Sequence, residues 1–166
     1  MNLFALFDDA RSRLQVIPRE GLGEIVQPAR ILGIHRRVRI VARGWVWHLG
    51  AILLSEDAVY ATGDIIRAHE EVRRGYAAES QRRRAELGAA ARRGGFAEGQ
   101  TVHLGWTPID LAAVGEGEAS GPLSLIGGVP SIRWSPRGGF VPLEPYVQER
   151  ISLMLHPPLG MGETPH

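Results

Sequence analysis

Residues 44–54 read GWVWHLGAILL, an almost unbroken run of apolar side chains, and the fold prediction starts from them. Strict alternation of apolar and polar residues fails here, so the run predicts a central strand with both faces covered. Because side chains alternate along a strand, Trp47 is expected in one buried layer and Ile52 in the other.

The segments on either side of this run predict more strands of an antiparallel sheet. Before it, Arg37, Arg39 and Arg43 alternate with apolar residues, which is typical of a strand with one solvated face. After it, a turn is expected at residues 55–57, and residues 58–62 are expected to return as the second strand of a hairpin.

Further strands are expected on both sides of this region. Residues 19–28 have the glycine and proline content of a linker, and residues 29–34 predict a short strand. Residues 100–106 alternate imperfectly and predict another strand. Two more strands, at 123–126 and 129–134, flank the hairpin signal Gly127-Gly128, and Pro130 places the second of them at a sheet edge.

Helices are expected at both ends of the chain. Asn2 can cap a first helix, in which apolar residues recur at helical spacing until Pro18 ends it. A short helix is expected to begin at Thr107-Pro108, with threonine as the cap. Pro145 can occupy the first turn of a last helix that continues to Leu155.

A long central helix is expected from residue 65 to residue 93, where Gly94-Gly95 ends it. Its apolar stripe is narrow and contains Arg83. The residues that form this stripe are Ala68, Val72, Tyr76, Leu87 and Ala91. The sequence therefore predicts an α+β fold with a mainly antiparallel sheet, N- and C-terminal helices and one long central helix, as a single domain over residues 1–160 with a frayed tail at 161–166.

Composition excludes several classes of chemistry. The 166 residues carry a net charge of +1, so no long-range field draws nucleic acid or an anionic membrane to the whole molecule. All basic residues are arginine, which excludes a Walker lysine and a Ser-x-x-Lys nucleophile. Without cysteine there is neither a disulfide nor a cysteine metal site, and no cofactor or metal is expected. Neither a signal peptide nor a membrane span is indicated, so the expected location is cytoplasmic.

The three histidines His48, His69 and His103 are the catalytic candidates. His48 and His103 lie in apolar strand segments and His69 begins the expected helix, so they could converge on a metal or a substrate. They lack the His-Glu-x-x-His spacing of a zinc protease helix, which favours histidines that are hydrogen-bonded structural residues.

The binding candidates are Trp47, Trp106 and Arg83. Residues 82–84 are all arginine, but arginines point in many directions around the expected helix and glutamates lie between them. This favours a solvated, salt-bridged helix over nucleic-acid binding. Alternatively, the helix packs against another subunit, with Arg83 paired to a partner carboxylate.

Four phrases carry a resemblance to a known group of proteins: WHLGAILL at 47–54, ATG at 61–63, RRGGF at 92–96 and HPPLG at 156–160. They resemble short, uncharacterised actinobacterial proteins, some of which are labelled glutaminase. The resemblance covers most of the chain and carries over no catalytic residues. Serine-dependent glutaminases use Ser-x-x-Lys, which a chain without lysine cannot contain.

Two functions are expected from these observations. The first is a non-catalytic binding or assembly module, most simply a homo-oligomer. The alternative is a small-molecule amide hydrolase in which His48 or His103 acts as the acid-base group, in a pocket beside Trp47 or Trp106.

Overall fold

The chain combines helices with mainly antiparallel strands, which confirms the α+β class. The computed structural model describes residues 2–27, 37–71, 75 and 78–159. None of the helices in this part of the chain has the length and apolar character of a membrane span.

The chain forms two compact units, and each is assembled from segments that are distant in sequence. The first unit contains residues 1–18, 47–61 and 107–166, and the second contains residues 19–46 and 62–106. The single-domain interpretation of residues 1–160 stays a prediction, and each unit is described by itself.

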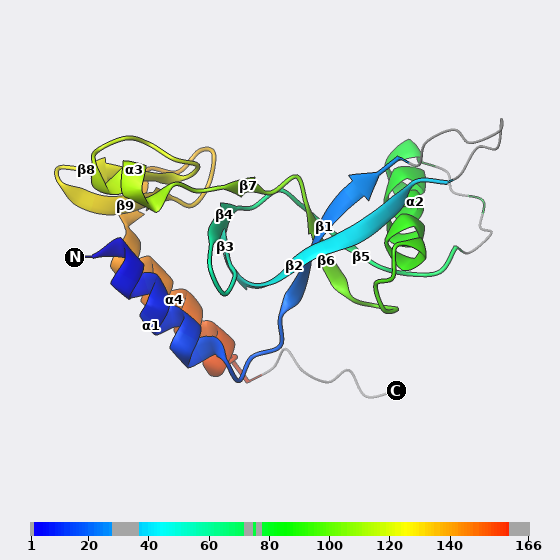
Figure 1. Cartoon of the computed structure of the whole chain (residues 1–166), viewed down its shortest axis with the longest axis horizontal. Helices are drawn as coiled ribbons and strands as arrows, with labels where there is room; N and C mark the ends of the chain where they lie inside the picture. Colours follow the sequence, from blue (N-terminus) through cyan, green and yellow to red (C-terminus); the bar gives the residue numbers. More distant parts are fainter. Residues whose placement is uncertain (1, 28–36, 72–74, 76–77, 160–166) are drawn as a thin grey trace. The chain divides into compact units, whose positions relative to one another are not determined.

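Figure 1 shows the helices and strands. In chain order they are α1 (Leu3–Leu14), β1 (Glu20–Val26), β2 (Arg39–Leu49), β3 (Ile52–Leu54), β4 (Val59–Ala61), β5 (Asp64–Arg67), α2 (Glu79–Arg93), β6 (Thr101–Leu104), β7 (Thr107–Pro108), α3 (Leu111–Gly115), β8 (Leu123–Ile126), β9 (Val129–Arg133), β10 (Phe140–Pro142) and α4 (Leu143–Leu155).

The apolar run at 44–54 is a hairpin, so the prediction of one central strand is wrong. β2 ends at Leu49, Gly50 takes a positive φ of 67°, and β3 returns antiparallel with Trp47 opposite Leu54. The turn could not be recognised from the sequence, because both strands of the hairpin are buried and apolar and no polar residue marks the turn. The predicted burial is correct, since Trp47 is 1% exposed and Ile52 is 0% exposed. Their predicted placement in two different layers is wrong, because the hairpin pairs Leu49 with Ile52, and Trp47 and Ile52 both join one core cluster.

In the first unit, the end of β2 is followed in the sheet by β3, β4 and β7. The predicted hairpin return at 58–62 is confirmed, since β4 pairs antiparallel with β3. The helix predicted from Thr107 begins later, because Thr107 and Pro108 form β7 against β4, and Asp110 caps α3 through a bond from the Ala113 N–H.

A separate three-stranded sheet in this unit has the order β10-β9-β8. Gly127 and Gly128, both at positive φ, form the predicted turn between β8 and β9. Pro130 is not on an edge strand, because β9 lies in the middle. The proline is tolerated because β10 pairs only with Ser131–Arg133 and requires no N–H from Pro130.

Helices α1 and α4 lie side by side in Figure 1, and both contribute side chains to the core of the first unit. As predicted, Asn2 caps α1, accepting from the Phe4 N–H at 2.9 Å. One face of each helix is buried. The buried residues are Leu3, Leu6, Phe7, Ala10 and Leu14 on α1, and Leu143, Tyr146, Val147 and Ile151 on α4.

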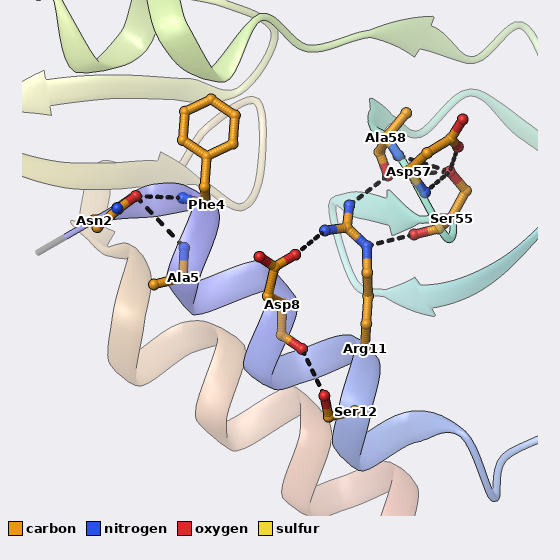
Figure 2. Close-up of polar contacts among 9 residues, drawn as sticks. All are labelled: Asn2, Phe4, Ala5, Asp8, Arg11, Ser12, Ser55, Asp57 and Ala58. Carbon is orange, nitrogen blue, oxygen red and sulfur yellow. Dashed lines mark hydrogen bonds and ion pairs between the residues drawn. The ribbon is translucent and has the colours of Figure 1, made fainter.

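The side chain of Arg11 joins α1 to the turn between β3 and β4 (Figure 2). Its Nε donates to the Ser55 carbonyl oxygen at 2.8 Å, and Nη1 pairs with Asp8 at 2.7 Å. Ser55 is itself buried, and its Oγ accepts from the Ala58 N–H at 2.9 Å. A charged donor therefore satisfies a backbone carbonyl of a turn that returns the chain to the core.

In the second unit, four strands have the order β5-β6-β1-β2. β1 is parallel to β6, and the other pairs are antiparallel. The linker predicted at 19–28 is wrong, since most of it forms β1. Its glycines allow close packing of other side chains on the strand. At Gly21, an added Cβ would lie 2.3 Å from the Phe96 ring, which is too close for any side chain at this position. The strand predicted at 29–34 lies outside the described residues.

The long helix predicted from residue 65 is wrong at its beginning. Residues 64–67 form β5, which pairs antiparallel with β6, and α2 begins only at Glu79. Val72 and Tyr76 lie outside the described residues. The buried face of α2 is made of small residues, Gly88 and Ala89–Ala91. The apolar stripe of larger residues predicted from the sequence therefore does not mark the buried face of this helix.

The predicted end of α2 is confirmed. Gly94 caps the helix, and Gly95 follows at a positive φ of 107°. A Cβ at Gly94 would lie 1.7 Å from the Ile40 carbonyl oxygen, so the helix end touches the backbone of β2. The core between α2 and the sheet includes Ile40, Ile66, Ala90, Phe96, Val102 and Leu104.

Arg11→Ala is expected to lower the free energy of unfolding by about 1.5–3 kcal/mol, because it removes a charged hydrogen bond to a buried carbonyl. Urea unfolding measures this change. Asp8→Ala is the control: it removes only the exposed ion pair, and a loss of about 1 kcal/mol or less is expected. Equal effects of the two substitutions would contradict a role for Arg11 in fixing the turn.

Gly50→Ala is expected to lower the free energy of unfolding by about 2–4 kcal/mol. Alanine is strained in the left-handed backbone conformation of residue 50, and its Cβ overlaps with a neighbouring side chain. The added Cβ would lie 2.1 Å from the Tyr146 hydroxyl. Gly127→Ala is the matched control, because Gly127 has φ 58° and no atom within 4 Å of the added Cβ. Gly127→Ala therefore introduces the backbone strain without the overlap, and it is expected to lower the free energy of unfolding by about 1–2 kcal/mol. Thermal and urea unfolding of both variants test the difference.

Candidate functional site

His103 lies on β6 of the second unit and is fully buried. Its Nε2 lies 2.5 Å from the carboxylate of Glu20 on β1, which accepts the hydrogen bond. The parallel pairing of the two strands places Leu22 opposite His103 and so brings Glu20 within reach. A buried imidazole beside a carboxylate can transfer a proton, and it can equally fix two strands.

The other two candidate histidines have structural partners. His48 belongs to the first unit, where its Nε2 donates to the Gly50 carbonyl oxygen at 2.8 Å across the hairpin turn. His69 follows β5 in the second unit, and its Nδ1 lies 3.1 Å from the Glu70 carbonyl oxygen. The convergence of the three histidines stays a prediction.

The two candidate tryptophans also take part in the packing of their units. Trp47 is buried in the core of the first unit, and its Nε1 donates to the Ile17 carbonyl oxygen at 2.9 Å. Trp106 is half-buried, and its Nε1 donates to the Gly23 carbonyl oxygen at 3.0 Å. Each indole N–H is therefore used in holding a neighbouring segment.

Arg83 lies in the lining of a surface hollow of about 470 Å³ between β5 and α2, which we call the β5–α2 hollow. The helix contributes Ser80, Arg83, Arg84 and Leu87. Their spacing of three, four and seven residues places them on one face of α2. The strand side contributes Gly63, Asp64, Ile65 and Ile66.

The hollow has an apolar base and a basic rim. Ile66 is buried and Leu87 is half-buried, whereas both arginines and Ser80 are exposed. Neither Arg83 nor Arg84 forms an ion pair with another residue in the described part of the chain. With Asp64 as the single carboxylate in the lining, the site favours an anionic ligand.

The strand side of the hollow is a sheet edge. β5 pairs with β6, and no other described strand pairs with it. Ile65 is 47% exposed, although its neighbour Ile66 lies in the core. A sheet edge with an exposed branched residue can accept a further strand.

Sequence reasoning missed Arg84, Ser80 and Ile65 as site residues. It placed Ile65 at the beginning of a helix, so a strand edge beside Arg83 could not be foreseen. The short pattern Asp64-Ile65-Ile66-Arg67, with branched residues between charged ones, was the available strand signal.

No protein-family model, curated protein or solved structure matches this chain. The site is therefore interpreted from its own residues.

Proposed function

We propose that this chain is a non-catalytic binding and assembly module whose β5–α2 hollow holds an extended, acidic segment of a partner protein. The observation that supports it is the pair Arg83 and Arg84, which carry two exposed guanidinium groups without described ion-pair partners beside an open strand edge.

The strand edge gives such a segment its main-chain partners. An extended peptide that adds to β5 would exchange N–H and C=O bonds with the strand, and these bonds supply affinity without dependence on sequence. Side chains alternate along the peptide, so every second one would face the hollow.

The side chains that line the β5–α2 hollow would make binding selective for an acidic peptide. Guanidinium groups bind carboxylates through charge-assisted hydrogen bonds, which are about twice as strong as neutral ones. Ile65 and Leu87 offer apolar contacts to neighbouring side chains of the peptide. A volume of about 470 Å³ accommodates a few side chains and not a folded domain.

The test probe is a fluorescein-labelled hexapeptide of alternating glutamate and valine. Arg83→Glu combined with Arg84→Glu is expected to weaken its binding at least about tenfold, because two attractive pairs become repulsive. Fluorescence anisotropy measures the dissociation constant. Affinity for the unchanged chain is expected to fall with added salt.

Two controls accompany this measurement. Arg82→Glu reverses one charge, half of the change in the double variant, on an exposed residue of α2 outside the lining, and binding is expected to stay within about twofold. A lysine-valine hexapeptide should bind more weakly than the acidic one. Equal loss of binding in the Arg82 variant, or no binding of the acidic peptide at all, would contradict the proposal.

A small-molecule amide hydrolase is the second candidate, favoured by the buried His103–Glu20 pair. If it is correct, the purified chain releases ammonia from glutamine, and His103→Ala lowers kcat by about 100-fold or more. His48→Ala tests the other candidate, and the thermal midpoint of each variant checks that the fold is kept. Absence of ammonia release by the unchanged chain would exclude this function for glutamine.

A further inference from the structure

A second hollow, of about 370 Å³, lies in the first unit beside the N-terminal half of α4, and we call it the α4 hollow. Trp134 and Pro142 line one side, and Pro145, Tyr146, Glu149 and Arg150 of α4 line the other. It involves no residue of the β5–α2 hollow and does not depend on the function proposed for that site.

The α4 hollow is aromatic and carries unused donors. Trp134 is 53% exposed, and its indole N–H donates to no other residue in the described part of the chain. Tyr146 is already used, because its hydroxyl accepts from the Ala51 N–H at 2.9 Å and so fixes the ring. The Arg150 guanidinium carbon lies 5.1 Å from the centroid of that ring.

This combination suits a polyproline II segment. Such a segment makes no internal hydrogen bonds, so its carbonyl oxygens are free to accept from an indole N–H or a guanidinium. Its pyrrolidine rings pack on aromatic faces, and its fixed φ lowers the entropy lost on binding. Glu149 is exposed on the rim and can accept a hydrogen bond from a donor side chain of the ligand.

The chain itself carries such a segment immediately after α4. His156, Pro157, Pro158 and Leu159 are all exposed, and Leu159 is 107% exposed. The two prolines restrict the backbone to extended conformations, Leu159 adds an apolar side chain, and the imidazole of His156 offers a donor to Glu149.

The two prolines cannot reach the Tyr146 ring of their own chain. Tyr146 lies ten residues before His156, which is about 15 Å along the helix. Pro157 and Pro158 are one and two residues past His156 and can reach back only about 7 Å. Prolines of this segment that pack beside Tyr146 must therefore belong to another copy of the chain.

We propose that residues His156–Leu159 of one copy bind in the α4 hollow of a second copy, which joins copies head to tail. Such a contact uses two different surfaces, so a pair of copies keeps one free hollow on one copy and one free segment on the other. Association can therefore continue beyond a dimer, unless the rotation between copies closes a ring.

The test uses two full-length variants with complementary defects. Trp134→Ala removes the exposed ring but keeps the segment, and Pro157→Ala with Pro158→Ala removes the prolines but keeps the hollow. Size-exclusion chromatography with light scattering measures mass against concentration. The unchanged chain is expected to grow beyond a dimer, while each variant alone associates at least about tenfold more weakly.

Mixing the two variants gives the decisive result. One intact hollow and one intact segment remain, so the mixture is expected to form a 1:1 dimer and nothing larger. Leu153→Ala is the matched control: Leu153 is an exposed apolar residue of α4 outside the hollow, and its removal should leave association unchanged. Circular dichroism checks the fold of every variant.

A synthetic peptide of residues 155–163 provides an independent readout. It is expected to dissociate assemblies of the unchanged chain, whereas the same peptide with both prolines replaced by alanine is not. The proposal is overturned if the unchanged chain stays monomeric at high concentration, if either variant associates normally, or if the mixture forms no dimer. Dissociation by the alanine peptide as well would also overturn it.

Discussion

The reversal of the chain at Gly50 is the constraint on which the first unit depends. The left-handed backbone at this residue folds an apolar run onto itself, so that Trp47 and Ile52 both reach the core. Tyr146 leaves room for nothing larger than hydrogen at Gly50, and its hydroxyl accepts from the next backbone N–H, that of Ala51. One glycine thereby couples the hairpin to α4, which also carries one wall of the α4 hollow.

The sequence predicted caps and tight turns with local signals well, and it predicted long-range pairing poorly. Asn2 and the pair Gly127-Gly128 act through their own backbone neighbourhood, and both behave as expected. By contrast, the turn at Gly50 and the strand at Glu20–Val26 depend on partners far along the chain. The same is true of the site: Arg83 was a candidate from sequence, but its strand neighbour Ile65 was assigned to a helix.

Small residues on α2 explain why most of its arginines are exposed. Gly88 and Ala89–Ala91 allow the helix to lie against the sheet, and Gly94 touches the carbonyl of Ile40 directly. A helix that packs through so short a patch buries little of its remaining surface, so its long charged side chains stay in solvent. The architecture that stabilises the second unit thus also forms the basic rim of the β5–α2 hollow.

The first unit is built from three separate parts of the chain, and this affects the order in which it can form during synthesis. Arg13 on α1 and Gln148 on α4 are hydrogen-bonded across 135 residues of sequence. While the ribosome makes those residues, the part of α1 that packs against α4 stays uncovered. We therefore expect the nascent chain to expose this amphipathic segment until Gln148 has been made, at about 5–20 residues per second, and to be a substrate for chaperones during that interval.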